Sequence, residues 1–489
     1  MSNESSNLVQ KVWNYAHVLR DQGISYGDYV EQITFLLFLK MDQERSELLG
    51  EPSIIPAKWR WEKLALLSGD PLELQYRHTL ENLAHEKGLI GTIFRKAQNK
   101  LTDPAKLKRI VSLIHDETWI GIGVDVKGTI YEGLLEKNAG EVKSGAGQYF
   151  TPRPLIEAMV KVIDPRIGET VHDPACGTGG FLLAAYDHMK GQSQDRNLQR
   201  KLREKSLTGV DIVDEVVRLC GMNLYLHGIG NGESPIRQAD ALATDPGDRY
   251  DVVLTNPPFG KKSSYRVVGD DGEIDTERED YERGDFKYTT SNKQLNFLQH
   301  IMTIMETGGR CGVVLPDNVL FEAGSAGEGI RERLLKQFDF HTLLRLPTGI
   351  FYKPGVKANV LFFDKHAPRA DGKPNSKAVW IYDFRTNMHF TLRKNTLKSS
   401  DLDDFVKCYS AADRSKRKED KADRFKRFAV EELLKRDKLN LDITWLKDDS
   451  LDDIDSLPSP DVLAAEIVEN LQAALEQFVA VADALATPK

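Results

Sequence analysis

About the first 140 residues carry apolar side chains at helical spacing. One run has its apolar residues three or four positions apart: Val9, Val12, Trp13, Ala16 and Leu19. A second run extends from Tyr26 to Met41, and glycines 23 and 27 separate the two. Residues at this spacing share one face of a helix. The pattern predicts a helical bundle, and nothing in it resembles a catalytic cluster.

The pattern changes near residue 145, where a Ser-Gly-Ala-Gly segment indicates a hinge. Short apolar runs then alternate with helical stretches. The predicted strands are residues 170–172, 207–212, 236–242, 250–255, 310–315, 343–346 and 359–363. Predicted helices, for example 181–189 and 213–226, fall between them. This alternation predicts βα units and therefore an α/β fold with a mainly parallel sheet.

Three segments depart from the alternation. Residues 261–292 are charged and contain glycines, so they are either a mobile substrate-contacting loop or a disordered surface insertion. Residues 414–427 are dense in charges of both signs, which favours a solvated linker or helix over a nucleic-acid contact. Residues 462–485 carry one apolar stripe, which predicts a helix that folds back or docks on a partner. The stripe consists of Leu463, Ile467, Leu471, Leu475, Phe478, Ala482 and Leu485.

Composition narrows the class of protein. Hydrophobic residues make up 40% and charged residues 29% of the 489 positions, as in ordinary globular proteins. The formal net charge of -8 argues against a free-standing DNA-binding protein, because phosphate contacts need a basic surface. The possibility that the chain is a subunit that meets DNA through a local patch or through a partner stays open.

The domain boundaries that we predict are a helical domain over 1–143, a catalytic domain over 144–410, and a charged linker with C-terminal helices over 411–489.

The cysteines and the apolar runs indicate a cytoplasmic protein. The four cysteines are scattered, with no close pair at metal-ligand spacing: Cys176, Cys220, Cys311 and Cys408. Reduced thiols explain them, and we expect no metal site. The first residues lack the basic region and apolar stretch of a signal peptide. The longest apolar runs, such as 33–39, are too short to span a bilayer.

The candidate chemistry begins at Asn256-Pro257-Pro258-Phe259, directly after the predicted strand 250–255. Ligands of open α/β sheets bind at the carboxyl ends of strands. Adenine N6 is a poor nucleophile, since its lone pair is delocalised, and an enzyme can activate it by accepting hydrogen bonds from both N6 hydrogens. The Asn256 side-chain oxygen and the Pro257 carbonyl can be these acceptors, and the Phe259 ring offers a face for stacking. The alternative is a strand that ends in an ordinary proline turn.

A glycine-rich loop, residues 173–181, follows the first predicted strand of the sheet. Its glycines permit a tight turn and a close approach of the backbone to a ligand. Position 182 is Leu, so the G-x-G-x-x-G spacing of dinucleotide-binding loops is not met. The leading Asp173 would accept hydrogen bonds from the methionine ammonium of S-adenosylmethionine, whereas it would repel a pyrophosphate.

Two further acids follow the next predicted strands. Asp211 can bind both ribose hydroxyls, and Asp240 can accept a hydrogen bond from the cofactor's adenine amino group. Each acid alone is more often a turn residue or a helix cap. Three acids at successive strand ends, followed by Asn256, are much harder to explain in that way. They predict one continuous cleft.

The order of these segments resembles the γ group of class I, S-adenosylmethionine-dependent amino-methyltransferases. More narrowly, the chain resembles the modification (M) subunit of type I restriction–modification systems, from the helical region to about residue 446. The segments that carry the resemblance are Gly147-Gln148-Tyr149-Phe150-Thr151-Pro152-Arg153, Asp173 to Phe181, and Asn256-Pro257-Pro258-Phe259-Gly260. Supporting segments are 296–300, 315–318 and 346–351.

The resemblance implies N6-methylation of a flipped-out adenine in DNA, at sites chosen by a separate specificity (S) subunit. It implies two M subunits and one S subunit in the methyltransferase, restriction (R) subunits in the nuclease, and docking through the C-terminal helices. It assigns catalysis to Asn256, Pro257, Pro258 and Phe259. It assigns cofactor binding to Gln148, Tyr149, Phe150, Thr151, Asp173, Ala175, Gly177, Thr178, Gly179, Gly180, Phe181, Asp211, Asp240, Ala241 and Asn256.

Other functions stay open from the residues alone. Cytosine N4 poses the same chemical problem as adenine N6. Glutamine methyltransferases also present Asn-Pro-Pro to a planar amide, although they tend to be shorter and lack the helical N-terminal part. A cofactor-binding scaffold without activity and a nicotinamide-dependent dehydrogenase are further alternatives, and the dehydrogenase rests on the glycine-rich loop alone.

Overall fold

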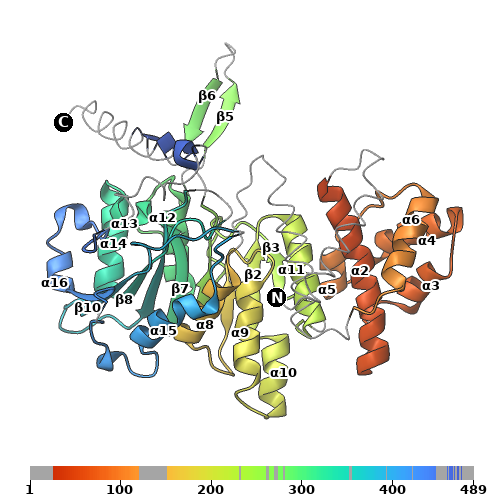
Figure 1. The fold of residues 1–489 in the computed structure, drawn as a ribbon, viewed down its shortest axis with the longest axis horizontal. Coiled ribbons are helices and arrows are strands. Elements are labelled where there is room, and N and C mark those ends of the chain that lie inside the picture. Colours follow the sequence, from red (N-terminus) through yellow and green to blue (C-terminus); the bar gives the residue numbers. More distant parts are fainter. Residues whose placement is uncertain are drawn as a thin grey trace. The chain divides into compact units, whose positions relative to one another are not determined.

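The computed structural model describes most of the chain (Figure 1). The described residues are 26–119, 151–230, 233–259, 264–268, 274–278, 281–351, 355–392, 394–420, 422–447 and parts of 460–475. The chain divides into two compact units. The first unit comprises Met1–Ala146, Cys176–Gly179 and Ser193–Ala239, and the second comprises Gly147–Ala175, Gly180–Gln192 and Asp240–Lys489. The three domains that the sequence predicts are a different division of the chain from these two units, and they stay a prediction.

The first unit is mainly helical, as expected from its apolar spacing. Its helices are α2 (Tyr26–Leu49), α3 (Trp61–Ala65), α4 (Asp70–Leu83), α5 (Gly88–Phe94), α6 (Pro104–His115), α10 (Arg196–Glu204) and α11 (Asp214–Leu226). It also holds two parallel strands, β2 (Leu207–Asp211) and β3 (Ile236–Gln238). The helix expected around residues 9–19 lies outside the described residues.

Local sequence explains how these helices begin and pack. The Asp103 side chain caps α6 by accepting from the Ala105 and Lys106 amides, and Pro104 occupies the first turn. The buried face of α6 joins a core built from α2, α3, α4 and α5. Met222, Tyr225 and Leu226 of α11 belong to the same core, so α11 is part of the helical unit.

The second unit is built on a mixed sheet. Its strands are β1 (Val171–Asp173), β4 (Tyr250–Thr255), β7 (Met305–Pro316), β8 (Phe338–Arg345), β9 (Ala358–Lys365), β10 (Ala378–Asp383) and β11 (Phe425–Ala429), and their order is β11-β10-β8-β9-β7-β4-β1. β1, β4, β7, β8 and β10 run in the same direction, while β9 and β11 run antiparallel to their neighbours. The expected mainly parallel sheet is therefore confirmed, and the carboxyl ends of its parallel strands meet at one edge.

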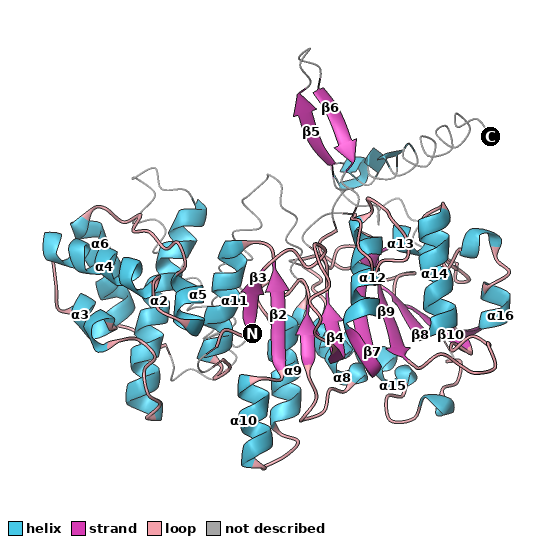
Figure 2. Cartoon of the chain, turned by 180° about the vertical axis from the view of Figure 1, so that it is seen from behind, coloured by secondary structure: helices cyan, strands magenta, loops and turns pink. Residues whose placement is uncertain are grey.

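Helices cover both faces of this sheet (Figure 2). They are α8 (Arg153–Ile163), α9 (Gly180–Lys190), α12 (Lys293–Ile304), α13 (Asn318–Phe321), α14 (Ser325–Gln337), α15 (Asp403–Tyr409) and α16 (Val430–Leu433). Val313 of β7 packs into one core with residues of α12 and α14. Gly312, the preceding residue, faces the opposite side of the sheet. A Cβ at Gly312 would lie 3.4 Å from Ile163 of α8. Alternation along β7 thus separates the two helical layers.

Two expectations from the sequence are wrong. The segment 261–292 is not irregular throughout, because β5 (Ser264–Val268) and β6 (Ile274–Arg278) pair as an antiparallel hairpin. Asp271-Gly272 between the two strands is a hairpin signal in the sequence. The stretch 414–427 is not a solvated linker, since Arg414 pairs with Asp364 and the stretch runs into edge strand β11.

Two smaller differences concern strand lengths and missed strands. β3 ends at Gln238, four residues before the predicted end, so Asp240 lies in the following turn. β10 and β11 were not predicted at all. No described helix is both long enough and apolar enough to cross a membrane.

Candidate active site at the carboxyl ends of β1 and β4

The register of β1 and β4 places two candidate residues at the same edge of the sheet. Val171 pairs with Val252 and His172 with Val253, so Asp173 is level with Leu254. Asn256 directly follows the last residue of β4 and lies two residues beyond Leu254, roughly 7 Å in the strand direction. Both side chains thus emerge where parallel strands end, which is where open α/β sheets bind ligands.

The amide of Asn256 is held in one orientation. Its Nδ2 donates to the Thr151 hydroxyl at 2.8 Å, and Thr151 is only 8% exposed. Thr151 directly precedes the N-cap of α8, so this bond fastens the start of α8 to the end of β4. The Oδ1 atom of the same amide is also buried. Two predicted segments that are 105 residues apart are therefore brought into contact.

The residues after Asn256 are braced from two sides. Gln294, near the start of α12, donates from Nε2 to the Pro258 carbonyl at 3.4 Å. Phe259 is 9% exposed, and its ring centroid lies 5.7 Å from that of Phe351 at an interplanar angle of 77°. Edge-to-face contacts of this kind fix ring orientation. Sequence reasoning did not name Phe351 as a site residue, although it ends one of the supporting segments.

Asp173 and the start of α9 have tight local surroundings. Asp173 is 1% exposed and accepts the Ala175 amide at 3.0 Å, so it also serves as a turn residue. Gly180 opens α9, and a Cβ there would lie 2.9 Å from Ile156 of α8. A side chain at this position would have to displace the end of the Ile156 side chain, so glycine favours the close approach of the two helices. Phe181 follows it and is buried at 3% exposure.

The first unit holds the other part of the glycine-rich loop. Gly177 and Gly179 have φ values of 52° and 88°, which favour glycine. The Gly177 amide donates to Asp211 Oδ2 at 3.1 Å, and the Val213 amide donates to Oδ1 at 2.9 Å. Burial raises the pKa of Asp211, although these two amides oppose that shift. The Thr178 carbonyl accepts from Asn223 of α11 at 3.0 Å, which ties the loop to that helix.

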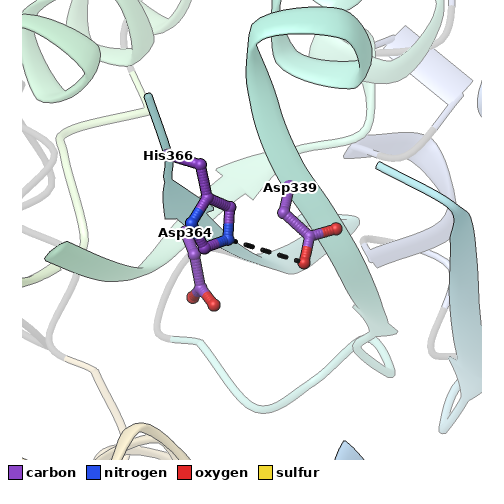
Figure 3. A group of neighbouring side chains, drawn as sticks. All are labelled: Asp339, Asp364 and His366. Carbon is purple, nitrogen blue, oxygen red and sulfur yellow. Dashed lines mark ion pairs between the residues drawn. The ribbon is translucent and has the colours of Figure 1, made fainter. Parts of the chain in front are cut away.

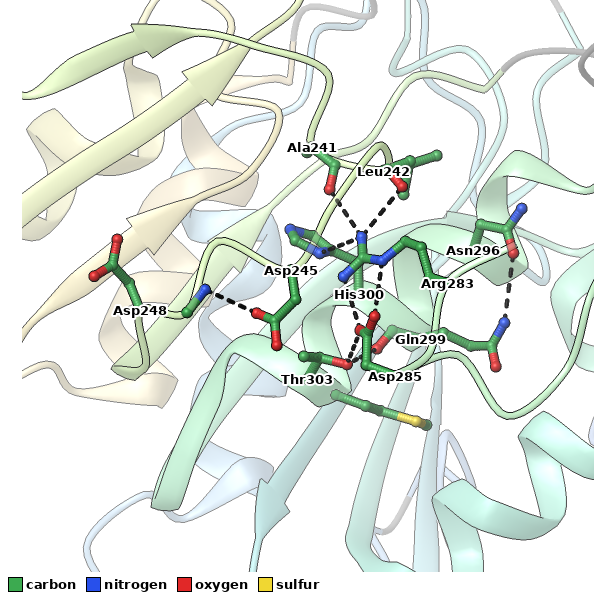
Figure 4. A network of polar contacts seen from close by, with 12 residues as sticks. Ala241, Leu242, Asp245, Asp248, Arg283, Asp285, Asn296, Gln299, His300 and Thr303 are labelled. Carbon is green, nitrogen blue, oxygen red and sulfur yellow. Dashed lines mark hydrogen bonds and ion pairs between the residues drawn. The ribbon is translucent and has the colours of Figure 1, made fainter. Parts of the chain in front are cut away.

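Asp240 and Ala241 belong to a turn that a polar network of the second unit contacts, and Figure 4 shows Arg283 of this network beside Ala241 and Leu242. Asp240 Oδ1 accepts the Leu242 amide at 2.8 Å, and Oδ2 accepts the Tyr281 hydroxyl at 3.3 Å. The Ala241 carbonyl accepts from Arg283 at 3.2 Å. Sequence reasoning missed Tyr281 and Arg283, because both belong to the segment that was taken as irregular.

The predicted site residues fall into three groups. Those of the second unit are Thr151, Asp173, Ala175, Gly180, Phe181, Asp240, Ala241, Asn256, Pro257, Pro258 and Phe259. Those of the first unit are Gly177, Thr178, Gly179 and Asp211. Gln148, Tyr149 and Phe150 lie outside the described residues. Contacts within the units join Thr151 to Asn256 and Gly177 to Asp211.

One further cluster has the geometry of a metal site (Figure 3). Ligand atoms of Asp339, Asp364 and His366 lie within 4.8 Å of one another. The Asp364 carboxylate is already paired with Arg414, and His341 Nε2 lies 3.4 Å from it. The guanidinium of Arg414 already supplies the positive charge that a metal ion would bring to Asp364. We therefore interpret this cluster as a charge-compensated junction of β8 and β9.

Comparison with known proteins identifies the family of the chain. A family model described as N-6 DNA Methylase matches residues 123–449, and one described as HsdM N-terminal domain matches residues 8–114. The StySPI type I restriction enzyme methylase subunit of Salmonella potsdam is 38% identical and covers 97% of this chain and 94% of its own length. The EcoKI methylase subunit of Escherichia coli strain K12 is 37% identical with the same coverage.

Solved structures give the same result for the fold. A modification subunit from Vibrio vulnificus YJ016 superposes with a TM-score of 0.70 at 26% identity, covering 89% of this chain and 94% of that one. The sheet and its helices thus have the class I methyltransferase fold, accompanied by a helical N-terminal domain. The chain belongs to the N-6 DNA methylase family and, within it, to the methylase subunits of type I restriction enzymes.

Proposed function

We propose that this protein transfers a methyl group from S-adenosylmethionine to N6 of an adenine in DNA, as the methyltransferase subunit of a type I restriction–modification complex. The observation that carries the proposal is the Asn256 amide, whose Nδ2 is bound by Thr151. With its donor end held, the amide has Oδ1, a hydrogen-bond acceptor, fixed in orientation at the carboxyl end of β4.

The slot built by Asn256, Pro257 and Phe259 suits an amino group on a planar ring. Asn256 Oδ1 and the Pro257 carbonyl would accept the two N6 hydrogens. Two preorganised acceptors favour the pyramidal nitrogen of the transition state over the planar amine. The target base must leave the duplex to reach such a slot, since its amino group is buried in the helix stack. The flipped adenine would stack on Phe259, whose ring is braced by the edge of Phe351.

The chain also has residues that fit the methyl donor. S-adenosylmethionine supplies an electrophilic methyl group on a sulfonium centre. Asp173 would accept from its ammonium group, Asp211 from its ribose hydroxyls, and Asp240 from its adenine amino group. Beside Asp211, Ile212 is 61% exposed and would give a base an apolar surface. A Cβ at Gly177 would meet no atom within 4 Å, which leaves room at the loop backbone for a ligand.

Subunit partners fit the charge and the tail of the chain. A protein with net charge -8 gains most of its DNA affinity from a partner or a local patch. In the described part of the tail, Ile467, Leu471 and Leu475 are 56%, 64% and 64% exposed. We propose that these residues dock on the S subunit, in a complex of two M subunits and one S subunit that R subunits join to form the nuclease.

The test is co-expression of the chain with its specificity subunit, followed by mapping of modified bases in the host DNA. The proposal expects N6-methyladenine at one recurrent sequence, and no modification with the Asn256→Ala variant. If N4-methylcytosine were found at that sequence instead, the target base would be cytosine and not adenine. Methylation of protein instead of DNA, or preferential binding of NAD over S-adenosylmethionine, would overturn the proposal.

A further inference from the structure

The segment Tyr281–Asp285 is fastened to the turn that carries Asp240, and Figure 4 shows the part of this contact made by Arg283. The Tyr281 hydroxyl donates to Asp240 Oδ2 at 3.3 Å, while the Leu242 amide donates to Oδ1 at 2.8 Å. Among the described residues, each carboxylate oxygen therefore has one hydrogen-bond partner. Since a carboxylate has about four lone-pair sites, room remains for one further donor on Oδ2. The two hydrogen bonds fix the plane of the Asp240 carboxylate and therefore the direction in which Oδ2 can accept a further hydrogen bond.

Arg283 fixes the backbone on which Asp240 sits. Its side chain is 4% exposed. Nη1 donates to the carbonyls of Ala241 and Leu242, each at 3.2 Å. Nε and Nη2 form a paired contact with Asp285 at 2.9 and 2.7 Å, so the buried charge is compensated.

His300 and Thr303 of α12 complete the network. Arg283 Nη1 also donates to His300 Nδ1 at 3.2 Å, and the Thr303 hydroxyl donates to Asp285 at 2.7 Å. Burial first, and then the charge of Arg283, lowers the pKa of His300 to about 4. The imidazole is therefore neutral near pH 7, which leaves Nδ1 with a lone pair to accept. The turn at Asp240 is thus anchored, through Arg283, to helix α12.

We propose that Tyr281 is a specificity-determining residue for the purine of the methyl donor, and that Arg283 positions the turn on which it acts. The inference rests on the proposed function, in which Asp240 accepts from the cofactor's 6-amino group. Tyr281 holds the Asp240 carboxylate so that its Oδ2 faces a donor. A 6-amino purine satisfies this acceptor, whereas a 6-oxo purine places an acceptor against an acceptor.

The physical basis is the penalty for mismatched polar groups at a partly buried site. A hydrogen bond to a charged group contributes enough for roughly a 100-fold preference. That preference depends on Asp240 staying in place, because a carboxylate that can rotate relieves the mismatch. Loss of the Tyr281 hydroxyl frees one side of the carboxylate, so discrimination falls even though Asp240 itself is unchanged.

The experiment compares two product analogues on the full-length chain by titration calorimetry: S-adenosylhomocysteine and its deaminated counterpart, S-inosylhomocysteine. The wild-type chain should prefer the first by about 100-fold. Tyr281→Phe removes one hydroxyl from a half-buried ring and should lower that ratio about fivefold, within the range of one lost hydrogen bond. The matched control is Tyr288→Phe, seven residues further along the chain, whose ring packs against Gly329 of α14. The control should keep the wild-type ratio.

The outcomes separate the inference from the proposal beneath it. A wild-type chain that discriminates, together with a Tyr281→Phe chain that keeps the same ratio, overturns the inference alone. A wild-type chain that binds both compounds equally, or binds neither, overturns the cofactor assignment on which it rests. Equal loss of the ratio in Tyr288→Phe would also overturn the inference, because the effect would then belong to the segment as a whole.

Discussion

Two sites at opposite ends of the sheet in the second unit hold polar groups in different ways. At the carboxyl end of β4, the neutral amide of Asn256 is held by its hydrogen bond to Thr151. At the other end, the Asp364 carboxylate is held by an ion pair with Arg414 and lies 3.4 Å from the imidazole of His341. Burial alone would raise the pKa of Asp364, but these two partners hold it well below its usual range.

The difference separates binding from stability. A neutral amide with one end fixed can offer its other end to a ligand at little cost in desolvation. A buried carboxylate that is saturated by a guanidinium serves the fold, because neither ion can leave without exposing the other. Changes at the carboxyl end should therefore affect turnover, and changes at the other end should affect unfolding.

The largest expected effect is at Asn256. Asn256→Ala removes the acceptor that we propose for the reacting amino group, so methyl transfer in the complex with the specificity subunit should fall about 1,000-fold. Unfolding by urea should change little. The matched control is Asn375→Ala, whose amide donates to the Gln337 carbonyl near the start of β8. Full turnover of Asn256→Ala, measured by tritium transfer to DNA, would contradict our role for that residue.

The second effect should appear only in stability. Asp364→Asn removes one charge and leaves Arg414 partly buried without its partner, which should cost about 3 kcal/mol of unfolding free energy. We take the lower end of the range because the Arg414 side chain is 33% exposed. The folded fraction should methylate DNA at the wild-type rate per molecule. A lower rate with unchanged stability would erase the distinction between the two ends.

The third prediction tests the bond that orients Asn256. Thr151→Val keeps the shape of the side chain but loses the hydroxyl, so transfer should fall about tenfold, as for one neutral hydrogen bond. Thr151→Ser restores an acceptor for Asn256 Nδ2 and should recover most of the rate. The two variants are compared by turnover at saturating methyl donor. Equal rates for valine and serine would show that the hydroxyl does not position the amide.

Sequence reasoning predicted the carboxyl end better than the other end for a physical reason. Asn256-Pro257-Pro258-Phe259 is a local motif after a continuous apolar strand, so its position and chemistry can be read together. The junction at Asp364 depends on Arg414, which is 50 residues away. Its charges resembled a solvated stretch because pairing at that distance leaves no periodic signal.

Partners supplied by other elements were missed for the same reason. Thr151 was predicted from a resemblance. Its hydrogen bond to Asn256 joins residues 105 positions apart and could not be predicted from the sequence. Tyr281 and Arg283 follow a charged hairpin, and only the fold places them on Asp240 and Ala241. Local motifs therefore indicate which groups react, while the groups that hold them in place depend on tertiary structure.

The smallest effect concerns a property that both ends share. His300, in the network over Asp240, and His341, beside Asp364, both have a pKa lowered to about 4, first of all by burial. In the unfolded chain each should titrate near 6.5, so between pH 6.5 and about 4 the unfolded state binds more protons. Stability conferred by the neutral imidazoles is therefore complete above pH 6.5 and lost on acidification toward pH 4.

His300→Gln keeps an oxygen that can accept from Arg283 but removes the titration. The fall in unfolding free energy from pH 7.5 to pH 6 should be smaller than in the wild type by roughly 0.8 kcal/mol, the share of one histidine. His341→Gln should give a similar change, since burial is the main cause at both positions. Urea unfolding at each pH measures it. An unchanged pH dependence in one folded variant would mean that its histidine takes up a proton at the same pH in the native and the unfolded protein, and burial would then not lower the pKa of that histidine.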